Sequence, residues 1–214
     1  MASRPKQAEP RPAPRLYLLT PRLADTAAFA KELAAALAGA DIAAVLLRLA
    51  EADERTLINY IKALAPIAQD NGAALLIDGH SELVARAGAD GAHLSGLDAF
   101  TAGLEALKPD HIAGAGSLPS RHDVMTAAEG GADYILFGET AGRDLDAVAE
   151  RVAWAAEVFE LPCAAFAARL DEIEPLVAAG ADFVALDCVW SDPRGAAKAI
   201  AEAAKRARLP EPAA

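Results

Sequence analysis

Short, uninterrupted apolar runs alternate along the chain with segments whose apolar residues recur at helical spacing. The runs lie at residues 16–20, 43–47, 73–78, 91–94, 112–116, 134–138, 163–167 and 183–187. Runs of this length without polar alternation are typical of parallel strands covered on both faces. Between two of them, Leu57, Ile61, Leu64 and Ala68 recur on one helical face, and we expect Pro66 to bend or shorten that helix. The pattern predicts strands and helices in strict alternation.

An internal repeat gives the number of units. Gly-Ala-Asp occurs at residues 39–41, 88–90, 131–133 and 180–182, each time before an apolar run, with spacings of 49, 43 and 49 residues. Glycine suits the left-handed position that ends a helix, and aspartate can accept hydrogen bonds from backbone amides at a strand entry. Each spacing corresponds to two strand–helix units. We therefore predict a single (β/α)8 TIM barrel with all four copies at one end; an open doubly wound sheet is the alternative.

The barrel is expected over residues 15–208, between a flexible proline-rich tail at 1–14 and a short C-terminal tail at 209–214. The 20 Lys and Arg against 31 Asp and Glu give a formal charge of −11, which disfavours nucleic acid and anionic lipid as partners. Without a signal segment or an apolar run of membrane length, we expect a cytoplasmic protein and leave a homo-oligomer open. Cys163 and Cys188 lack metal spacing, and reduced core thiols are the favoured interpretation.

In such a barrel, the side chains that follow the C-terminal ends of the strands form the site. Arg48 comes directly after an apolar run, and its guanidinium is suited to bidentate phosphate binding. The alternative is an ion pair with Glu51 or Asp53. The sequence leaves the two open.

Two carboxylates that follow predicted strands are candidates for a metal. Asp78 and Asp98 together would hold Mg²⁺, a hard cation that takes carboxylates and phosphate oxygens. The alternatives are that Asp78 forms a turn before Gly79 and that Asp98 caps a helix starting at Ala99. For Asp98 the cap is the favoured interpretation.

Further polar residues follow the fifth and sixth predicted strands. The stretch 114–117 lacks the third glycine of a dinucleotide fingerprint, so we expect no nucleotide cofactor, while Ser117 fits a backbone nest for an anion. Glu139 is the candidate general acid or base, with an ion pair to Arg143 as the alternative. His93 lies in an apolar run, where a satisfied core histidine is the usual case.

Several segments together resemble a known family. They are Leu-Tyr-Leu-Leu-Thr at 16–20, Gly-Ala-Asp-Gly-Ala-His-Leu at 88–94, Gly-Ala-Asp-Tyr-Ile-Leu-Phe-Gly at 131–138 and Val-Ala-Ala-Gly-Ala-Asp-Phe-Val-Ala-Leu at 177–186. In this order, over about residues 15–207, they resemble thiamine phosphate synthase and its thiazole tautomerase (TenI) relatives. The resemblance implies a TIM barrel. It also implies a reaction that joins a pyrimidine pyrophosphate to a thiazole phosphate with Mg²⁺ and releases pyrophosphate.

The synthase residues match this chain only in part. Arg48 matches the arginine of the family's Gln-Leu-Arg-Glu-Lys, but the lysine is absent. Asp78-Gly79 stands where the family has Asn-Asp, Asp98 matches the second metal aspartate, and Ser117 matches the serine after the fifth strand. Tyr17, in the first matching segment, is a further candidate for substrate binding.

After the sixth and seventh strands the chain departs from the family. The stretch 138–143 is short and lacks the synthase lysine, and Glu139 stands where the tautomerase has its catalytic histidine. Arg143 is the cation available in this loop for phosphate. The family's Gly-Gly phosphate loop is replaced by Ala-Ala-Arg at 167–169, and alanine restricts the close approach of a phosphate to backbone amides.

Three hypotheses for the function follow. The favoured one is a protein near thiamine metabolism that binds a phosphorylated or heteroaromatic metabolite through Arg48, Ser117 and Arg143, with an incomplete synthase apparatus. The second is a divergent but active synthase, and only this one requires Mg²⁺, on the two candidate aspartates. The third is a TenI-type thiazole isomerase in which Glu139 moves the proton. We expect no redox cofactor in any of them.

Overall fold

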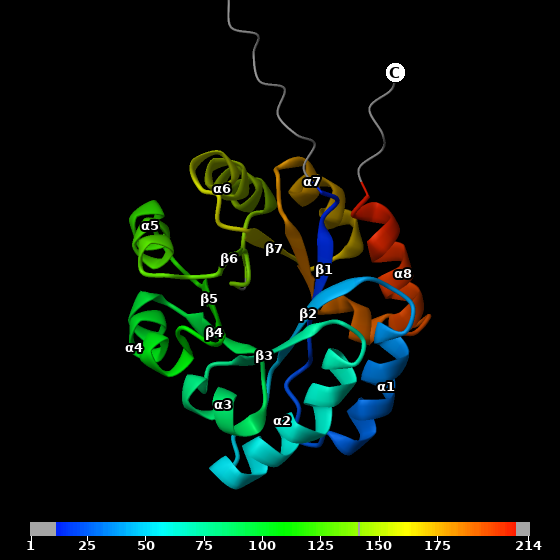
Figure 1. The fold of residues 1–214 in the computed structure, drawn as a ribbon. Helices are drawn as coiled ribbons and strands as arrows, with labels where there is room; N and C mark the ends of the chain where they lie inside the picture. The colour runs from blue at the N-terminus through cyan, green and yellow to red at the C-terminus, as the bar shows by residue number, and fades with distance from the viewer. Residues whose placement is uncertain (1–11, 141, 209–214) are drawn as a thin grey trace, which may run out of the picture.

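The computed structural model describes residues 12–140 and 142–208, and in them eight parallel strands close into a barrel in sequence order (Figure 1). The strands are β1 (Arg15–Leu19), β2 (Ile42–Leu47), β3 (Ala74–Asp78), β4 (Gly91–Ser95), β5 (Ile112–Gly116), β6 (Tyr134–Phe137), β7 (Cys163–Ala167) and β8 (Phe183–Leu186). All eight coincide with the predicted apolar runs to within about a residue, and the predicted (β/α)8 barrel is confirmed. The expected tails lie outside the described residues, apart from residues 12–14.

Helices follow the strands and cover the barrel from outside (Figure 1). The α-helices are α1 (Ala27–Leu37), α2 (Glu54–Gln69), α3 (Val84–Ala87), α4 (Leu97–Leu107), α5 (Arg121–Glu129), α6 (Leu145–Val158), α7 (Ile173–Ala178) and α8 (Ala196–Arg206). Three 3₁₀ turns are η1 (Ser81–Leu83), η2 (Leu170–Glu172) and η3 (Cys188–Ser191). The predicted apolar face of α2 is buried. The helix continues through Pro66 and ends at Gln69, so Pro66 does not shorten it.

The strands separate two apolar clusters. Alternate side chains of a strand point to opposite faces, so Leu18 and Val45 pack among residues of the surrounding helices. Tyr17, Leu46 and Leu76 belong to a second cluster that fills the inside of the barrel. This alternation decides which side chains near the strand ends reach the barrel axis.

The Gly-Ala-Asp segments all lie at the N-terminal end of the barrel, as predicted. The carboxylates of Asp90, Asp133 and Asp182 each accept a hydrogen bond from a backbone amide at the start of the neighbouring, preceding strand, at 2.7, 2.7 and 2.9 Å. The first copy differs, because Asp41 pairs with the Arg15 side chain of β1 instead of an amide. Gly39 also lacks the positive φ of the other three glycines. In three of its four copies the repeat therefore joins neighbouring strands by a carboxylate–amide hydrogen bond, and in the first copy by an ion pair.

The two cysteines are thiols and lie far apart in the fold. Cys163 begins β7, at the N-terminal end of the barrel, and Cys188 begins η3, beyond the C-terminal end of β8. Their positions at opposite ends of the barrel rule out a disulfide between them, and Cys188 is half-buried rather than part of the core. Over residues 12–140 and 142–208, no helix is long and apolar enough to cross a lipid bilayer.

Candidate functional site

Two adjoining cavities lie at the C-terminal ends of the strands and share Leu19, Arg48 and Glu139 in their walls. The larger has a volume of about 480 Å³ and is also lined by Thr140, Gly142, Arg143, Phe166, Ala168, Arg169, Glu172 and Asp187. The smaller, of about 170 Å³, is also lined by Leu46, Asp78, His93, Ser95, Ser117 and Leu136. Small-ligand sites in barrels of this type occupy this end.

Arg48 reaches both cavities from the end of β2. Its backbone amide donates to Thr20 Oγ1 at 3.0 Å, its Nε donates to the carbonyl oxygen of Thr20, and its terminal nitrogen pairs with Asp187 Oδ2 at 3.0 Å. The alternative interpretation, an ion pair of Arg48 with Glu51 or Asp53, is therefore wrong. Asp53 instead accepts from the amide of Thr56 as the N-cap of α2.

Glu139 stands between the two cavities. Ser117, at a positive φ of 50°, donates its hydroxyl to Glu139 Oε1 at 2.6 Å. The carboxylate packs so closely on Gly116 that a Cβ there would lie 2.3 Å from Oε1. Its other oxygen, Oε2, lies 3.5 Å from Nε2 of His93, whose side chain is 2 % exposed. In the part of the chain that the structure describes, neither of these two buried atoms has a hydrogen-bond partner.

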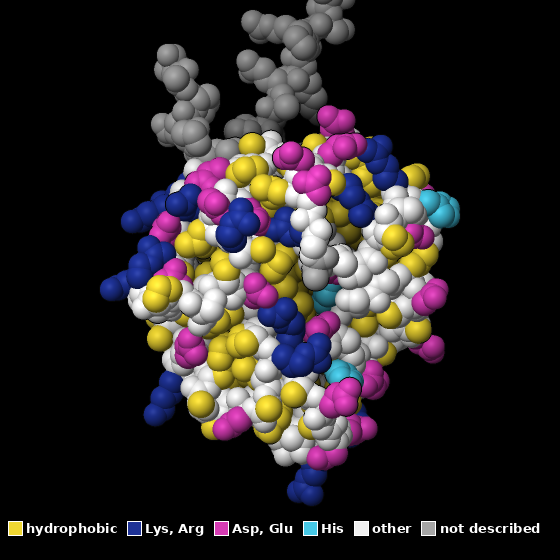
Figure 2. All heavy atoms as spheres, turned by 180° about the vertical axis from the view of Figure 1, so that it is seen from behind, with side chains coloured by type: hydrophobic (Ala, Val, Ile, Leu, Met, Phe, Trp, Pro, Cys, Tyr) yellow, Lys and Arg dark blue, Asp and Glu magenta, His cyan; other side chains and the backbone are white. Residues whose placement is uncertain are grey.

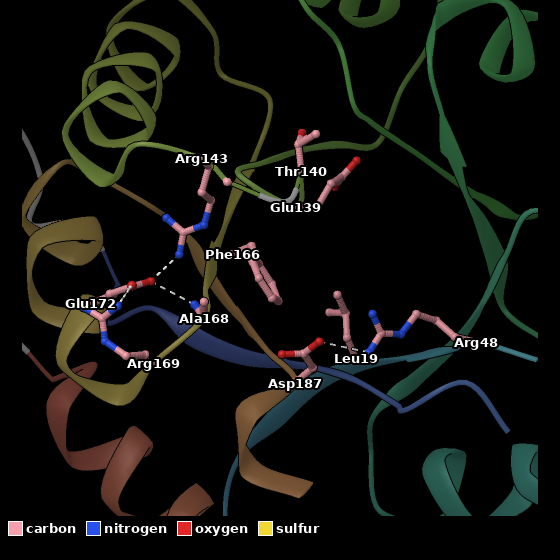
Figure 3. A pocket seen from close by; sticks show the side chains of 11 residues that line it. Leu19, Arg48, Glu139, Thr140, Arg143, Phe166, Ala168, Arg169, Glu172 and Asp187 are labelled. Atoms are coloured by element: carbon pink, nitrogen blue, oxygen red, sulfur yellow. Dashed lines mark hydrogen bonds and ion pairs between the residues drawn. The ribbon is translucent and has the colours of Figure 1, made fainter. Parts of the chain in front are cut away.

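The Arg143 guanidinium is bound to a carboxylate in the larger cavity. Its partner is Glu172, so the alternative of an ion pair between Arg143 and Glu139 is wrong; the side chains of Arg143 and Glu172 are 10 % and 6 % exposed. The Glu172 carboxylate also accepts from the backbone amide of Ala168 at 2.9 Å and pairs with Arg169 at 3.0 Å. Figure 3 shows Phe166 between this cluster and the Arg48 pair; the Arg143 guanidinium carbon lies 5.6 Å from the centre of the Phe166 ring.

The structure does not bring the two predicted metal ligands, Asp78 and Asp98, into one cavity. Asp78 lines the smaller cavity, whereas Asp98 is exposed in the first turn of α4 and does not line either of these cavities. Asp98 does not cap a helix starting at Ala99, because α4 begins at Leu97 with Gly96 as its N-cap. Within the described ranges, no group of three His, Cys, Asp or Glu side chains could hold a metal ion.

Tyr17 lies inside the barrel, below the site. It lines a separate, mainly apolar cavity of about 300 Å³ together with Tyr134. The two hydroxyls are 2.8 Å apart, and Tyr134 Oη lies 3.0 Å from Nδ1 of His93. Burial raises the pKa of both tyrosines well above their ordinary value. The contact between His93 and Tyr134 was not predicted from the sequence. The alternation of side chains along β4, which places His93 inside the barrel, is the sequence feature that indicates it.

Figure 2 shows acidic and basic side chains interspersed over the visible face of the molecule, without one large patch of either sign. On this face, no large patch of one charge marks a binding site.

Comparisons of the sequence with known proteins relate the chain to one family. A family model described as thiamine monophosphate synthase matches residues 16–187. A thiamine-phosphate synthase from Rhodospirillum centenum is 39% identical over 197 residues, which cover 88% of this chain and 95% of that protein. One from Hyphomonas neptunium is 37% identical over 206 residues, covering 90% and 93%. Among solved structures, a thiamine phosphate pyrophosphorylase from Pyrococcus furiosus shares the fold, with a TM-score of 0.75, 23% identity, and coverage of 90% of this chain and 95% of that one.

Proposed function

The chain belongs to the thiamine monophosphate synthase family, and from that premise we propose that it binds a phosphorylated or heteroaromatic metabolite in the larger cavity. The observation that carries the proposal is the placement of Phe166 between two arginines, Arg48 and Arg143, in one cavity of about 480 Å³. An aromatic ring suits a heteroaromatic ring, and a guanidinium suits a phosphate. A cavity of this size is adequate for one small metabolite.

We further propose that the synthase apparatus of this chain is incomplete. Each arginine of the larger cavity is already held by a carboxylate: Arg48 by Asp187, and Arg143 and Arg169 by Glu172. The loop after β7 is where the family resemblance implies phosphate binding, and there the Glu172 carboxylate accepts the backbone amide of Ala168. An internal carboxylate thus makes the contacts that a phosphate would need. Pyrophosphate release needs cations free to stabilise developing negative charge.

The described residues do not fit a preformed magnesium site. Asp78 faces the smaller cavity, and Asp98 is exposed on α4. Mg²⁺ is usually bound by one or two carboxylates together with water and substrate phosphates, so a carboxylate away from the cavity adds nothing to such a set.

Proton transfer by Glu139 is the second candidate function, corresponding to an isomerase of the tautomerase type. It is favoured by the position of the carboxylate in the shared wall of both cavities, where a bound ring can reach it. Ser117 fixes one carboxylate oxygen by its hydrogen bond of 2.6 Å. A general base has to be held within hydrogen-bond reach of its substrate, and this arrangement supplies such a group.

Calorimetric titration tests the proposal. Thiazole phosphate, hydroxymethylpyrimidine pyrophosphate and inorganic phosphate are each titrated with and without Mg²⁺, and we expect saturable binding of thiazole phosphate without the metal. In a product assay with saturating Mg²⁺, we expect coupling at least ~10²-fold slower than by the Rhodospirillum centenum relative, because preorganised charge stabilisation is missing. Turnover within about tenfold of that relative would establish the synthase instead. Failure of every probe to bind would refute the metabolite site.

A further inference from the structure

A column of buried polar groups runs along the inside of the barrel to Glu139. The hydroxyls of Tyr17 and Tyr134 are 2.8 Å apart, and Tyr134 Oη is 3.0 Å from His93 Nδ1. The three side chains come from β1, β6 and β4, and are 2 %, 7 % and 2 % exposed. The imidazole stacks on the Tyr134 ring at 5.7 Å between centroids. The far nitrogen of His93 faces Glu139 Oε2 at 3.5 Å.

Only one direction of the hydrogen bonds satisfies the whole column. Burial raises the pKa of both tyrosines, so both hydroxyls keep their protons at neutral pH. If Tyr17 donates to Tyr134 and Tyr134 donates to Nδ1 of His93, the imidazole proton is on Nε2, the nitrogen that lies 3.5 Å from Glu139 Oε2. The reverse direction leaves the Tyr17 proton without an acceptor among the described contacts. It also sets an Nε2 lone pair against a carboxylate oxygen, two acceptors face to face.

We propose that the Tyr17–Tyr134 pair fixes His93 as its Nε2–H tautomer, and that His93 is thereby the positioning residue of the Glu139 carboxylate. The two buried atoms without partners in the described part of the chain, His93 Nε2 and Glu139 Oε2, are then donor and acceptor of one interaction. The 3.5 Å separation exceeds the length of a charge-assisted hydrogen bond by roughly 0.6 Å. Such bonds in ligand-free sites are often long and tighten when a ligand binds.

With this proton in place, each oxygen of Glu139 faces a donor: Ser117 donates to Oε1 at 2.6 Å, and His93 Nε2–H lies 3.5 Å from Oε2. Two such donors would hold the carboxylate in one orientation at the wall of both cavities. Of the charged groups around it, Asp78 and Arg48 line the same small cavity, and neither makes a hydrogen bond to His93 among the contacts described. The catalytic meaning of this device rests on the proposed proton transfer by Glu139, but the device itself requires no ligand.

Nitrogen-15 NMR of the imidazoles in the full-length protein tests the tautomer. The chain has four histidines, of which His93 is the buried one among the residues described, and His93→Gln identifies its signals by their loss. We expect a protonated Nε2 and an unprotonated Nδ1 at neutral pH. Tyr134→Phe, which removes the donor to Nδ1, should abolish this preference. Tyr60→Phe, at a half-buried position of α2 whose hydroxyl donates to the Ala24 carbonyl oxygen, should leave it unchanged. An Nδ1–H tautomer or a doubly protonated ring in the unmodified protein would overturn the proposal.

A pair of conservative variants separates positioning from packing. Glutamine places its amide nitrogen near the Nε2 position of histidine, whereas asparagine reaches only the Nδ1 position. We expect the ¹³Cδ signal of Glu139 to keep its chemical shift in His93→Gln and to move in His93→Asn, although both variants remove the ring. Equal changes in the two would overturn the positioning role. Because neither measurement uses a metabolite, failure of the proposed binding function and failure of this inference are read from different experiments.

Discussion

Removing the Asp187 carboxylate should strengthen phosphate binding at the site rather than weaken it. Asp187 holds Arg48 at 3.0 Å, and the two side chains are 34% and 25% exposed. Such partly exposed pairs contribute at most about 1 kcal/mol. In Asp187→Asn that interaction becomes available to a ligand phosphate. The guanidinium stays in place, because its Nε still donates to Thr20.

The assay is calorimetric titration of thiazole phosphate at fixed ionic strength. We expect Asp187→Asn to tighten Kd about fivefold, which corresponds to about 1 kcal/mol, and Arg48→Ala to weaken it about 10- to 150-fold, from ~1.5–3 kcal/mol for a charged hydrogen bond. The double variant should behave like Arg48→Ala alone, since the gain acts through that guanidinium. Asp192→Asn is the control: it removes an equal charge, whose partner is Arg194, and should leave the Kd unchanged. Weaker binding in Asp187→Asn, or a gain that persists without Arg48, would refute the reasoning.

Three further predictions concern stability, placement and reactivity. Asp90→Ala should lower the free energy of unfolding in urea by about 1–3 kcal/mol, because it leaves the buried Leu75 amide of β3 unpaired. Asp41→Ala, at the same position of the repeat, loses an exposed ion pair and should lower it by about 1 kcal/mol or less. Equal losses in the two variants would contradict this prediction. Gly116→Ala should displace the Glu139 carboxylate, since the new Cβ would lie 2.3 Å from it, and a crystal structure of the variant with that carboxylate unmoved would disprove the steric argument. Burial, and secondly the neighbouring Asp187 carboxylate, raise the pKa of Cys188 to about 11. Its alkylation by iodoacetamide should therefore be slow at pH 8, and its rate should rise about tenfold per pH unit towards that pKa. A rate that does not change above pH 8 would show that the thiol is not shifted in this way.

The strands could be predicted from sequence because each is covered on both faces. Burial on both sides leaves continuous apolar runs, and the Gly-Ala-Asp repeat adds a count of units that the runs alone do not supply. The repeat also predicted the end of the barrel at which it lies. Its one exception, Asp41, follows a glycine with an ordinary φ and faces Arg15, a difference that the three shared letters do not encode.

The site partners could not be predicted, because the expected alternatives were local in sequence and the real partners are distant. Arg48 pairs with a residue 139 positions away, and Tyr17 with one 117 positions away. Closure of the ring brings β1 beside β8 and sets the register between strands. The order of the strands follows from the sequence, but the register that decides which inward side chains meet does not. His93 was therefore interpreted as a satisfied core residue, although one of its nitrogens faces Glu139.

The balance of charge in the larger cavity limits what can bind there. Three arginines and three carboxylates, Glu139, Glu172 and Asp187, line the same wall. A phosphate dianion entering this cavity has to displace carboxylates from guanidinium groups, so the gain from each new ion pair is offset by the loss of an existing one. Phosphate alone should consequently bind weakly, and affinity has to come from the rest of the ligand. Phe166 lies between the Arg48–Asp187 pair and the Arg143–Glu172 pair (Figure 3) and offers apolar contact to a ring. A metabolite that combines a phosphate with a heteroaromatic ring therefore suits the site better than either part alone.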